Sequence, residues 1–270
     1  MKLSTFPDIY HIALKASIEA SKVIIEFYEK GFQSEIKKDG SPVTEADLAS
    51  SEIISRILNS TNIPILGEET IHQDFAERKN WKLNWCVDPL DGTKEFIKRN
   101  DQFAVNIALI ENKQTIFGII ASPTDNTVLF GGEKVGVFIS HFRDINNETK
   151  WLKLSARTIA NNPLVMTMSH SPNSGASFDF IEKLKLTYPS IEYLKKGSAL
   201  KFFDLAEGKA DIYPRFAPTM EWDIAAGQAI LEALGGSITS IESGQKLVYN
   251  KENLFNPHFI ALTKPLIKLF

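Results

Sequence analysis

A short apolar run that ends in aspartates places the strongest constraint on the fold of this chain. Residues 85–87 read WCV and are followed by the hexapeptide DPLDGT at 88–93. Aspartate is depleted in strands and a proline cannot donate to a continuing ladder, so a buried strand is predicted to end at Asp88. The Asp-Gly pair then predicts a turn. After it, Thr93 can begin the next segment with its hydroxyl and free backbone N–H groups available to an anion.

Carboxylates, a hydroxyl and free amides in so short a segment favour a site for a metal ion and a phosphate group. The same residue types also build an ordinary aspartate-capped turn. Taken alone, the hexapeptide leaves both interpretations open.

The composition indicates a globular protein without the charge of a general nucleic-acid binder. With 270 residues, 43% of them hydrophobic, the chain can form one large domain or two modest domains with a sizeable core. The formal net charge of -3 provides no bulk basic field for nonspecific nucleic-acid binding. An anionic ligand would therefore have to be held locally.

The sequence also indicates the cellular compartment in which the protein is expected. Cys86 is the single cysteine, which excludes an internal disulfide framework. No apolar run approaches the length of a transmembrane segment, and the first residues lack the pattern of a signal peptide. We expect a cytoplasmic protein, and peripheral contact with the cytoplasmic face of the inner membrane stays open. A monomer and a homodimer are equally compatible with the sequence.

Periodicity in the first half predicts two helices and then an antiparallel sheet. Apolar residues recur at helical spacing over 6–30. Thr44 is a natural N-cap for a second helix, with Asp47 at the third helical position. A short strand at 64–66 then leads to the acidic residue Glu68. Four β-rich runs with short turns between them predict an antiparallel meander over 103–110, 115–121, 128–130 and 135–140.

The second half alternates between strand-like and helix-like segments, as in an α/β domain. A last helix is predicted from Asp223 to the glycines at 235 and 236. We place a boundary in the polar stretch at 141–149, which divides the chain into an N-terminal domain, 1–145, and a C-terminal domain, 146–270. The alternating segments are strands at 164–168, 191–194 and 210–213 and helices at 178–186 and 199–207.

Acidic residues gather at the ends of the predicted elements. They are Glu68, Asp88, Asp91 and Asp223, with Asp47 and Thr93 near helix starts. Such hard oxygen ligands suit Mg²⁺ better than Zn²⁺. Two Mg²⁺ ions sharing a carboxylate could promote in-line displacement at phosphorus, with an Asp47–Thr93 pair polarising the attacking water. Taken singly, Asp223 is also explained as a helix cap and Asp47 as a residue that satisfies N–H groups at a helix start.

Four blocks of the sequence resemble the Mg²⁺-dependent, lithium-sensitive inositol monophosphatase superfamily. The DPLDGT and WD motifs are typical of the whole superfamily. By contrast, KEFIKR at 94–99 and YPRF at 213–216 are typical of its CysQ-type 3'(2'),5'-bisphosphate nucleotidase branch. The four blocks are 37–47 (KKDGSPVTEAD), 67–69 (GEE), 88–110 (DPLDGTKEFIKRNDQFAVNIALI) and 222–236 (WDIAAGQAILEALGG).

This resemblance implies a layered αβαβα sandwich, the inositol monophosphatase-like sugar phosphatase fold. Its N-terminal α+β domain would contain an antiparallel sheet, and its C-terminal domain would be α/β. The implied activity is Mg²⁺-dependent hydrolysis of adenosine 3',5'-bisphosphate to AMP and phosphate, which would support sulfate assimilation. The alternatives are an inositol or sugar monophosphatase and, outside catalysis, a nucleotide or phosphate sensor.

The resemblance also implies roles for residues around the acidic cluster. Asp47 and Thr93 match the family's water-activating pair. Gly92 and Thr93 would hold the departing phosphate. Two or three Mg²⁺ ions are implied, with Asp88 shared between two of them. The implied metal ligands are Glu68, Asp88, the Leu90 carbonyl, Asp91 and Asp223.

On the nucleotide side, the matching positions lie in the second half of the chain. The sequence departs from the pattern at Met168, where related sequences often carry arginine, and at Ala199, where many carry serine. A solvated helix charge at Lys201 and a surface ion pair at Arg215 are the simpler alternatives. Lys37 lies in a polar loop and is left outside the primary site. The residues matched to the nucleotide or its second phosphate are Ser169, His170, Gly197, Ser198, Lys201 and Arg215.

Overall fold

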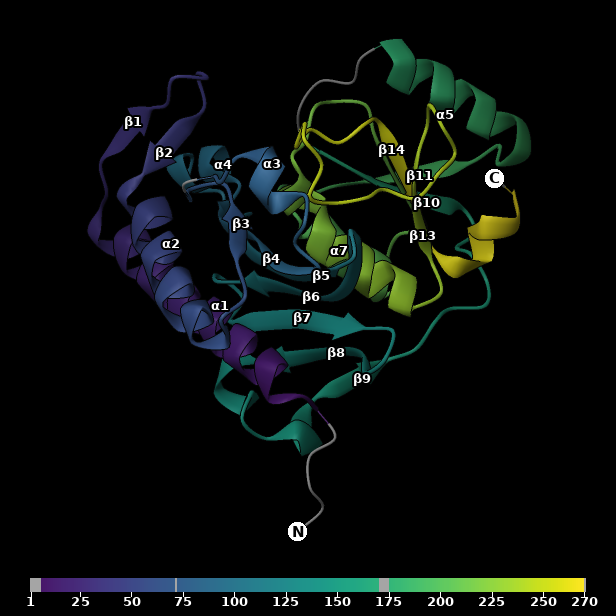
Figure 1. The fold of residues 1–270 in the computed structure, drawn as a ribbon. Helices are drawn as coiled ribbons and strands as arrows, with labels where there is room; N and C mark the ends of the chain where they lie inside the picture. Colours follow the sequence, from purple (N-terminus) through teal and green to yellow (C-terminus); the bar gives the residue numbers. More distant parts are fainter. Residues whose placement is uncertain (1–5, 71, 170–174, 270) are drawn as a thin grey trace.

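Two β-sheets, with helices between and outside them, make up the structure (Figure 1). It is a computed structural model that describes residues 6–70, 72–169 and 175–269. The larger sheet has seven strands in the order β3-β4-β5-β6-β7-β8-β9, and the smaller has five in the order β11-β10-β12-β14-β13. A separate antiparallel ribbon pairs β1 (Ser34–Ile36) with β2 (Pro42–Thr44).

The larger sheet is antiparallel from β4 to β9, and only β3 joins its neighbour in parallel. This confirms the predicted antiparallel meander between residues 103 and 140. The strands are β3 (Ile65–Gly67), β4 (Leu83–Asp91), β5 (Ala104–Glu111), β6 (Gln114–Ser122), β7 (Thr127–Gly132), β8 (Gly136–His141) and β9 (Leu152–Leu154).

The smaller sheet is mixed. Strand β10 pairs in parallel with β11 and β12, as the alternating sequence pattern predicts, whereas β14 runs antiparallel to β12 and β13. The strands are β10 (Leu164–Met168), β11 (Ile191–Lys195), β12 (Ile212–Arg215), β13 (Ser237–Ser240) and β14 (Phe259–Leu262).

Helices divide the molecule into layers (Figure 1). One buried cluster joins α1 and α2 to the first sheet, a second joins α6 and α7 to both sheets, and a third joins α5 to the smaller sheet. The layer order confirms the predicted αβαβα sandwich. The helices are α1 (Asp8–Lys30), α2 (Glu45–Leu58), α3 (Phe75–Arg78), α4 (Thr93–Ile97), α5 (Gly175–Thr187), α6 (Lys201–Ala206) and α7 (Glu221–Ala233), with 3-10 turns η1 (Asn59–Thr61), η2 (Phe142–Asp144), η3 (Glu148–Lys150) and η4 (Lys264–Leu269).

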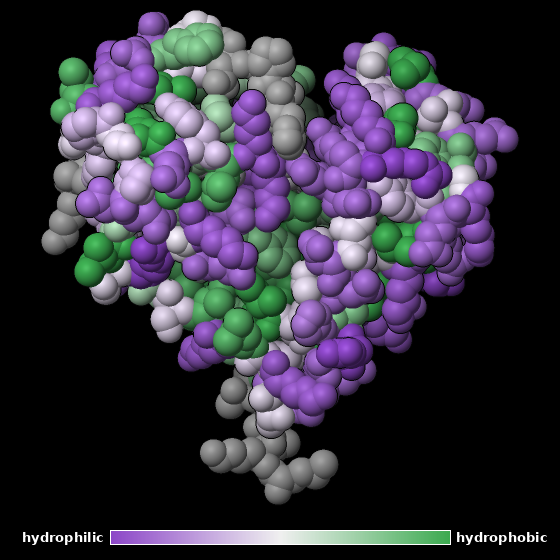
Figure 2. All heavy atoms as spheres, turned by 180° about the vertical axis from the view of Figure 1, so that it is seen from behind, coloured by the Kyte–Doolittle hydropathy of each residue, from purple (hydrophilic) through white to green (hydrophobic). Residues whose placement is uncertain are grey.

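Hydrophilic residues cover most of the face seen in Figure 2, and hydrophobic residues form smaller groups on it. The apolar side chains that the helices contribute are instead concentrated in the three buried clusters. Among the described residues, no helix combines the length and the apolar character needed to cross a membrane.

Several boundaries differ from the sequence-based expectations: helix α7 begins at Glu221 rather than at Asp223, and strand β12 lies at 212–215 rather than at 210–213. Strand β4 does not end at Asp88: after an irregularity in register, its pairing resumes between Asp91 and Ala104. A bulge of this kind accommodates the proline that was expected to end the strand. Strand β9 at 152–154 pairs in the first sheet, beyond the boundary placed after residue 145. The division into two domains itself stays a prediction.

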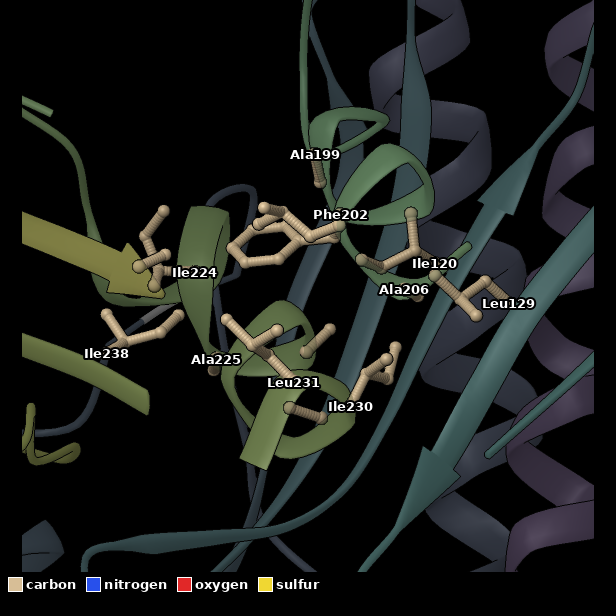
Figure 3. Packing of buried hydrophobic residues seen from close by; sticks show 14 of the residues in the cluster. Ile120, Leu129, Ala199, Phe202, Ala206, Ile224, Ala225, Ile230, Leu231 and Ile238 are labelled. Atoms are coloured by element: carbon tan, nitrogen blue, oxygen red, sulfur yellow. The ribbon is translucent and has the colours of Figure 1, made fainter. Parts of the chain in front are cut away.

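Helix α7 lies between the sheets because two glycines permit close contacts (Figure 3). A Cβ at Gly118, on β6, would lie 2.2 Å from the carbonyl oxygen of Ala226. A Cβ at Gly227, on α7, would lie 2.2 Å from the ring of Phe202, which α6 contributes. Both distances are below any van der Waals contact, so side chains there would displace the helix that carries Asp223.

Candidate active site

The end of β4 and the start of α4 form a tight turn. Gly92 is the N-cap of α4 and has a φ of 98°, in the left-handed region that glycine adopts without strain. Within the turn, the Leu90 amide donates to Oδ1 of the buried Asp88 at 3.1 Å. The first N–H groups of α4, from Thr93 onward, have no partner within the helix. The turn therefore presents carboxylates and amides on one short segment.

Helix α7 brings a third carboxylate to this turn. Oxygen atoms of Asp88, Asp91 and Asp223 all lie within 4.8 Å of one another. Asp223 is the third residue of α7, and its Oδ2 accepts a hydrogen bond from the Met220 amide at 2.9 Å. Asp223 is thus both a residue that satisfies the N-cap amide at the start of α7 and a member of the acidic cluster.

Ionisation of Asp88 and Asp223 is unfavourable within this cluster. Burial and, after it, the charges of Glu68 and Asp91 raise the pKa of Asp88 well above its usual range. Burial and the charge of Asp91 raise the pKa of Asp223 to about 8. A divalent cation would remove this repulsion, and the cluster, in the described part of the chain, consists of carboxylates alone. Its chemistry therefore fits a hard cation such as Mg²⁺.

A carboxylate and a hydroxyl meet beside the turn. Thr93 Oγ1 donates to Asp47 Oδ1 at 2.8 Å, and the other oxygen of Asp47 accepts the Thr44 amide at 2.8 Å and the Thr44 hydroxyl at 2.5 Å. The bond from the Thr44 amide, together with the bond from the Asp47 amide to the Thr44 side chain, forms the predicted capping box at the start of α2. Burial raises the pKa of Asp47 despite the lowering effect of its hydrogen bonds. Asp47 is thus at once a capping residue and a partner of Thr93.

Glu68 lies near the acidic cluster, but it accepts a hydrogen bond from a lysine. Lys37 Nζ donates to Glu68 Oε1 at 2.8 Å and also to Glu69. Burial works against the ammonium, but the hydrogen bonds that Lys37 donates to both glutamates outweigh it and hold the pKa of Lys37 above its usual range. Among the described residues, the three-carboxylate cluster does not include Glu68. Lys37 was not predicted to belong to the site, but it contacts Glu68, one of the predicted metal ligands.

An open pocket of about 210 Å³ extends from the acidic cluster to the smaller sheet. Asp91, Gly92 and Asp223 line one part of it. Cationic and hydroxyl side chains from the second half of the chain line another part. These are Ser169, Ser198, Lys201 and Arg215.

Lys201 is buried, which contradicts its interpretation as a solvated helix charge. Its Nζ donates to the carbonyl oxygens of Ser198 at 2.5 Å and Lys196 at 3.3 Å, and lies 5.1 Å from the centre of the Tyr213 ring. Burial lowers the pKa of Lys201 to about 8. A buried ammonium that faces a pocket is suited to an anionic ligand group.

Arg215 is half-buried and bonded to a hydroxyl. Its Nη1 donates to Ser169 Oγ at 2.6 Å, and its buried Nε has no hydrogen-bond partner among the described residues. Within that same part of the chain, no carboxylate forms an ion pair with Arg215, so the alternative of a surface ion pair is wrong. His170 lies outside the described residues.

Two polar residues in this region were missed by sequence reasoning. Asn106 is buried on β5 directly opposite Asp88, and its Nδ2 donates to Asp91 Oδ2 at 3.2 Å. Gln102 precedes β5 and accepts a hydrogen bond from the Gly197 amide at 2.6 Å. A single polar residue within the apolar run AVNIALI is a signal that could have identified Asn106. The Gln102 contact joins residues far apart in sequence and has no local signal.

A family model described as the inositol monophosphatase family matches residues 7–267. The chain belongs to the inositol monophosphatase family. Metal dependence is typical of this family, and the acidic cluster agrees with it.

Curated members of the family that resemble this chain are named 3'(2'),5'-bisphosphate nucleotidase CysQ. The Haemophilus influenzae protein is 34% identical over 256 residues, which cover 92% of this chain and 90% of that protein. The Buchnera aphidicola protein is 38% identical over 234 residues, with 83% and 82% of the two chains covered.

Solved structures of family members share the fold. CysQ from Bacteroides thetaiotaomicron has a TM-score of 0.85 and 38% identity, covering 96% of this chain and 98% of that one. An inositol monophosphatase from Thermotoga maritima has a TM-score of 0.75 and 21% identity, covering 97% and 95%. The second likeness concerns the fold alone.

Proposed function

We propose that this protein is a Mg²⁺-dependent 3'(2'),5'-bisphosphate nucleotidase that converts adenosine 3',5'-bisphosphate to AMP and phosphate. The observation that carries this proposal is the pocket that connects the acidic cluster, including Asp91 and Asp223, with the cationic side chains of Lys201 and Arg215. A substrate with two phosphates could use both parts at once. The curated names of the CysQ relatives support the same activity.

The acidic residues would hold the metal. Two or three Mg²⁺ ions would be bound, and when bound they supply positive charge that neutralises the phosphate and promotes in-line displacement. Raised pKa values at Asp88 and Asp223 support this assignment, because a cation would relieve the repulsion that causes part of the shift. The proposed ligands are Glu68, Asp88, the Leu90 carbonyl, Asp91 and Asp223.

Asp47 and Thr93 would act on the attacking water. Because the Thr93 hydroxyl donates to Asp47, its lone pairs remain free to accept a hydrogen bond from water. The water oxygen would form a bond to the 3'-phosphorus while the bond from phosphorus to the ribose 3'-oxygen breaks. The water would pass a proton toward Asp47, and the ribose oxygen would leave with a proton from solvent. A carboxylate whose pKa is raised by burial is a better proton acceptor than an exposed one.

The remaining predicted residues would hold the nucleotide. Gly92 and Thr93 would bind the departing phosphate with their backbone and hydroxyl groups. The second phosphate would be bound by cationic and hydroxyl groups on the other side of the pocket. These groups belong to His170, Ser198, Lys201 and Arg215.

The wider setting follows from the same activity. Removal of this nucleotide would support sulfate assimilation in the cytoplasm, by a protein that acts as a monomer or homodimer, with or without contact with the inner membrane. An N-terminal domain over 1–145 would carry most metal ligands, and a C-terminal domain over 146–270 would carry Asp223 and the nucleotide side.

Phosphate release tests the proposal. The purified protein is assayed on adenosine 3',5'-bisphosphate, inositol 1-phosphate and fructose 1,6-bisphosphate, each with Mg²⁺, with Mg²⁺ plus Li⁺, and with chelator. The expected result is Mg²⁺-dependent, Li⁺-inhibited release that is fastest from the nucleotide. Preference for the inositol or sugar ester would contradict the nucleotide assignment. Tight nucleotide binding without release would indicate a sensor.

A further inference from the structure

One loop spans the two sides of the pocket. It connects β11 to α6 and carries Ser198, whose φ of 56° lies in the left-handed region that few residues other than glycine adopt. Ser198 Oγ and the Ala199 amide both donate to Asp91 Oδ2, at 2.7 and 2.5 Å. Asp91 thus bonds to the loop as well as belonging to the acidic cluster.

Gln102 makes a second attachment to the same loop. Its Oε1 accepts the Gly197 amide at 2.6 Å. Its backbone carbonyl lies 3.1 Å from the position of a Cβ at Gly92 and 3.0 Å from the position of a Cβ at Gly197. Gln102 is therefore packed between the turn that begins α4 and the loop that precedes α6.

The loop determines where the Lys201 ammonium lies. Lys201 Nζ donates to the carbonyl oxygens of Lys196 and Ser198, which flank Gly197. A shift of the Gly197 peptide would move these acceptors and the ammonium with them. Gln102 itself is not among the described residues that line the pocket, so its effect on a ligand would pass through this loop.

We propose that Gln102 is a positioning residue that sets the preference for substrates with a second phosphate. The inference rests on the proposed nucleotidase function. The Gln102 side chain accepts a hydrogen bond from the backbone of the loop. Asp91 also bonds to the loop, but it would be needed for metal binding as well, so a substitution there could not test the loop position alone. At position 199, alanine offers only its backbone N–H to Asp91.

The test compares adenosine 3',5'-bisphosphate with adenosine 3'-monophosphate, which lacks the second phosphate. Gln102→Met keeps the length of the side chain but removes the acceptor. For the bisphosphate, KM is expected to rise between about twofold and tenfold, the range for one lost hydrogen bond, with kcat retained. For the monophosphate, both constants should stay at wild-type values. Gln114→Met, at an exposed position at the start of β6, is the matched control.

A double-mutant cycle between Gln102 and Lys201 distinguishes a positioning role of Gln102 from a general loss of structure. In a Lys201→Met background, Gln102→Met should add no further change in KM for the bisphosphate, because its effect passes through the ammonium. Additive effects would overturn the proposal, and so would equal losses on both nucleotides. Thermal unfolding checks that each variant folds, and Gln102→Ala replaces Gln102→Met in the cycle if the methionine variant does not.

Wild-type kinetics distinguish the two possible failures. If wild-type protein hydrolyses neither nucleotide with Mg²⁺, the proposed function is wrong and this inference is rejected with it. If wild-type protein prefers the bisphosphate and the Gln102 variants keep that preference, only the positioning role is rejected.

Discussion

Thr93 Oγ1 donates a hydrogen bond to Asp47 Oδ1 at 2.8 Å, joining the first residue of α4 to the third residue of α2. The two residues are 46 positions apart in sequence. Each also has a local role, since Asp47 closes a capping box and Thr93 begins a helix. A hydroxyl oriented by a buried carboxylate is the arrangement that general base catalysis requires.

Asp47→Asn should reduce kcat for phosphate release by about 100-fold or more, the typical contribution of a general base. KM should change little, because Asp47 is not proposed to contact the nucleotide. The amide can still accept from the Thr44 amide, so the cap and the melting temperature should be largely retained. Asp179→Asn, on the exposed side of α5, is the control. Wild-type kcat in Asp47→Asn would exclude the proposed water-activating pair.

Stability without metal should depend on pH in an unusual direction. The pKa of Asp223 rises from 3.8 to about 8, so the folded state holds a proton that the unfolded state loses between these values. The free energy of unfolding in chelator should therefore fall as pH increases from about 4 to 8. Added Mg²⁺ should raise the melting temperature more at pH 8 than at pH 5, because the cation favours the ionised cluster.

Calorimetry at fixed protein concentration measures this effect, and Asp223→Asn should weaken the pH dependence in chelator, while Asp88, whose pKa is also raised, retains part of it. A melting temperature that rises over the same range, or an equal Mg²⁺ effect at both pH values, would contradict the cluster as the metal site.

Lys201→Met should lower kcat/KM for adenosine 3',5'-bisphosphate by about 10- to 100-fold, the range for a lost charge-assisted hydrogen bond. Adenosine 3'-monophosphate should be much less affected. Because the pKa of Lys201 is lowered to about 8, its charge is present below that pH and lost above it. The wild-type preference for the bisphosphate should therefore decline as pH rises through about 8.

The ratio of the two specificity constants, measured from pH 6 to pH 9, reports this titration and cancels effects shared by both substrates. Lys183→Met, at an exposed position on α5, is the control for a change of net charge. A constant ratio over this range would show that Lys201 does not contact the second phosphate.

Gly227→Ala should destabilise the protein by about 1–3 kcal/mol, as overpacking of a filled core does. The added methyl would lie 2.2 Å from the Phe202 ring, so α7 would be displaced within the buried cluster, part of which Figure 3 shows. Gly175→Ala is the matched control, since a Cβ there meets nothing within 4 Å. Urea unfolding gives both values. Equal stability of the two variants would show that α7 is not held by this contact.

Local sequence patterns were enough to predict most elements and the identity of the acidic residues. Helical periodicity predicted α1 at 6–30 and the structure has it at Asp8–Lys30, and the capping box of α2 followed from Thr44 and Asp47. Pairing of β4 beyond Asp88 could not be predicted, because it depends on a bulge against β5 rather than on the residues of β4 alone.

Contacts between distant segments were beyond this reasoning. A lysine in a polar loop is usually solvated, which places Lys37 outside the predicted site, yet its ammonium donates hydrogen bonds to Glu68 and Glu69. A lysine on a helix is compatible with a solvated charge, yet Lys201 is buried. In both cases burial and partner were decided by packing of another part of the chain.

The sequence by itself determined which chemical groups this protein can use: carboxylates at element ends, a threonine at a helix start, and lysine and arginine in the second half. Periodicity of 2 and 3.6 residues and local capping are short-range properties, so a single chain displays them directly. Only the tertiary structure decided that Asp223 lies within 4.8 Å of Asp88 and Asp91, and that Gln102 bonds to Gly197. Those distances depend on how closely α7 packs between two sheets, and that packing is a sum of contacts that no local pattern encodes.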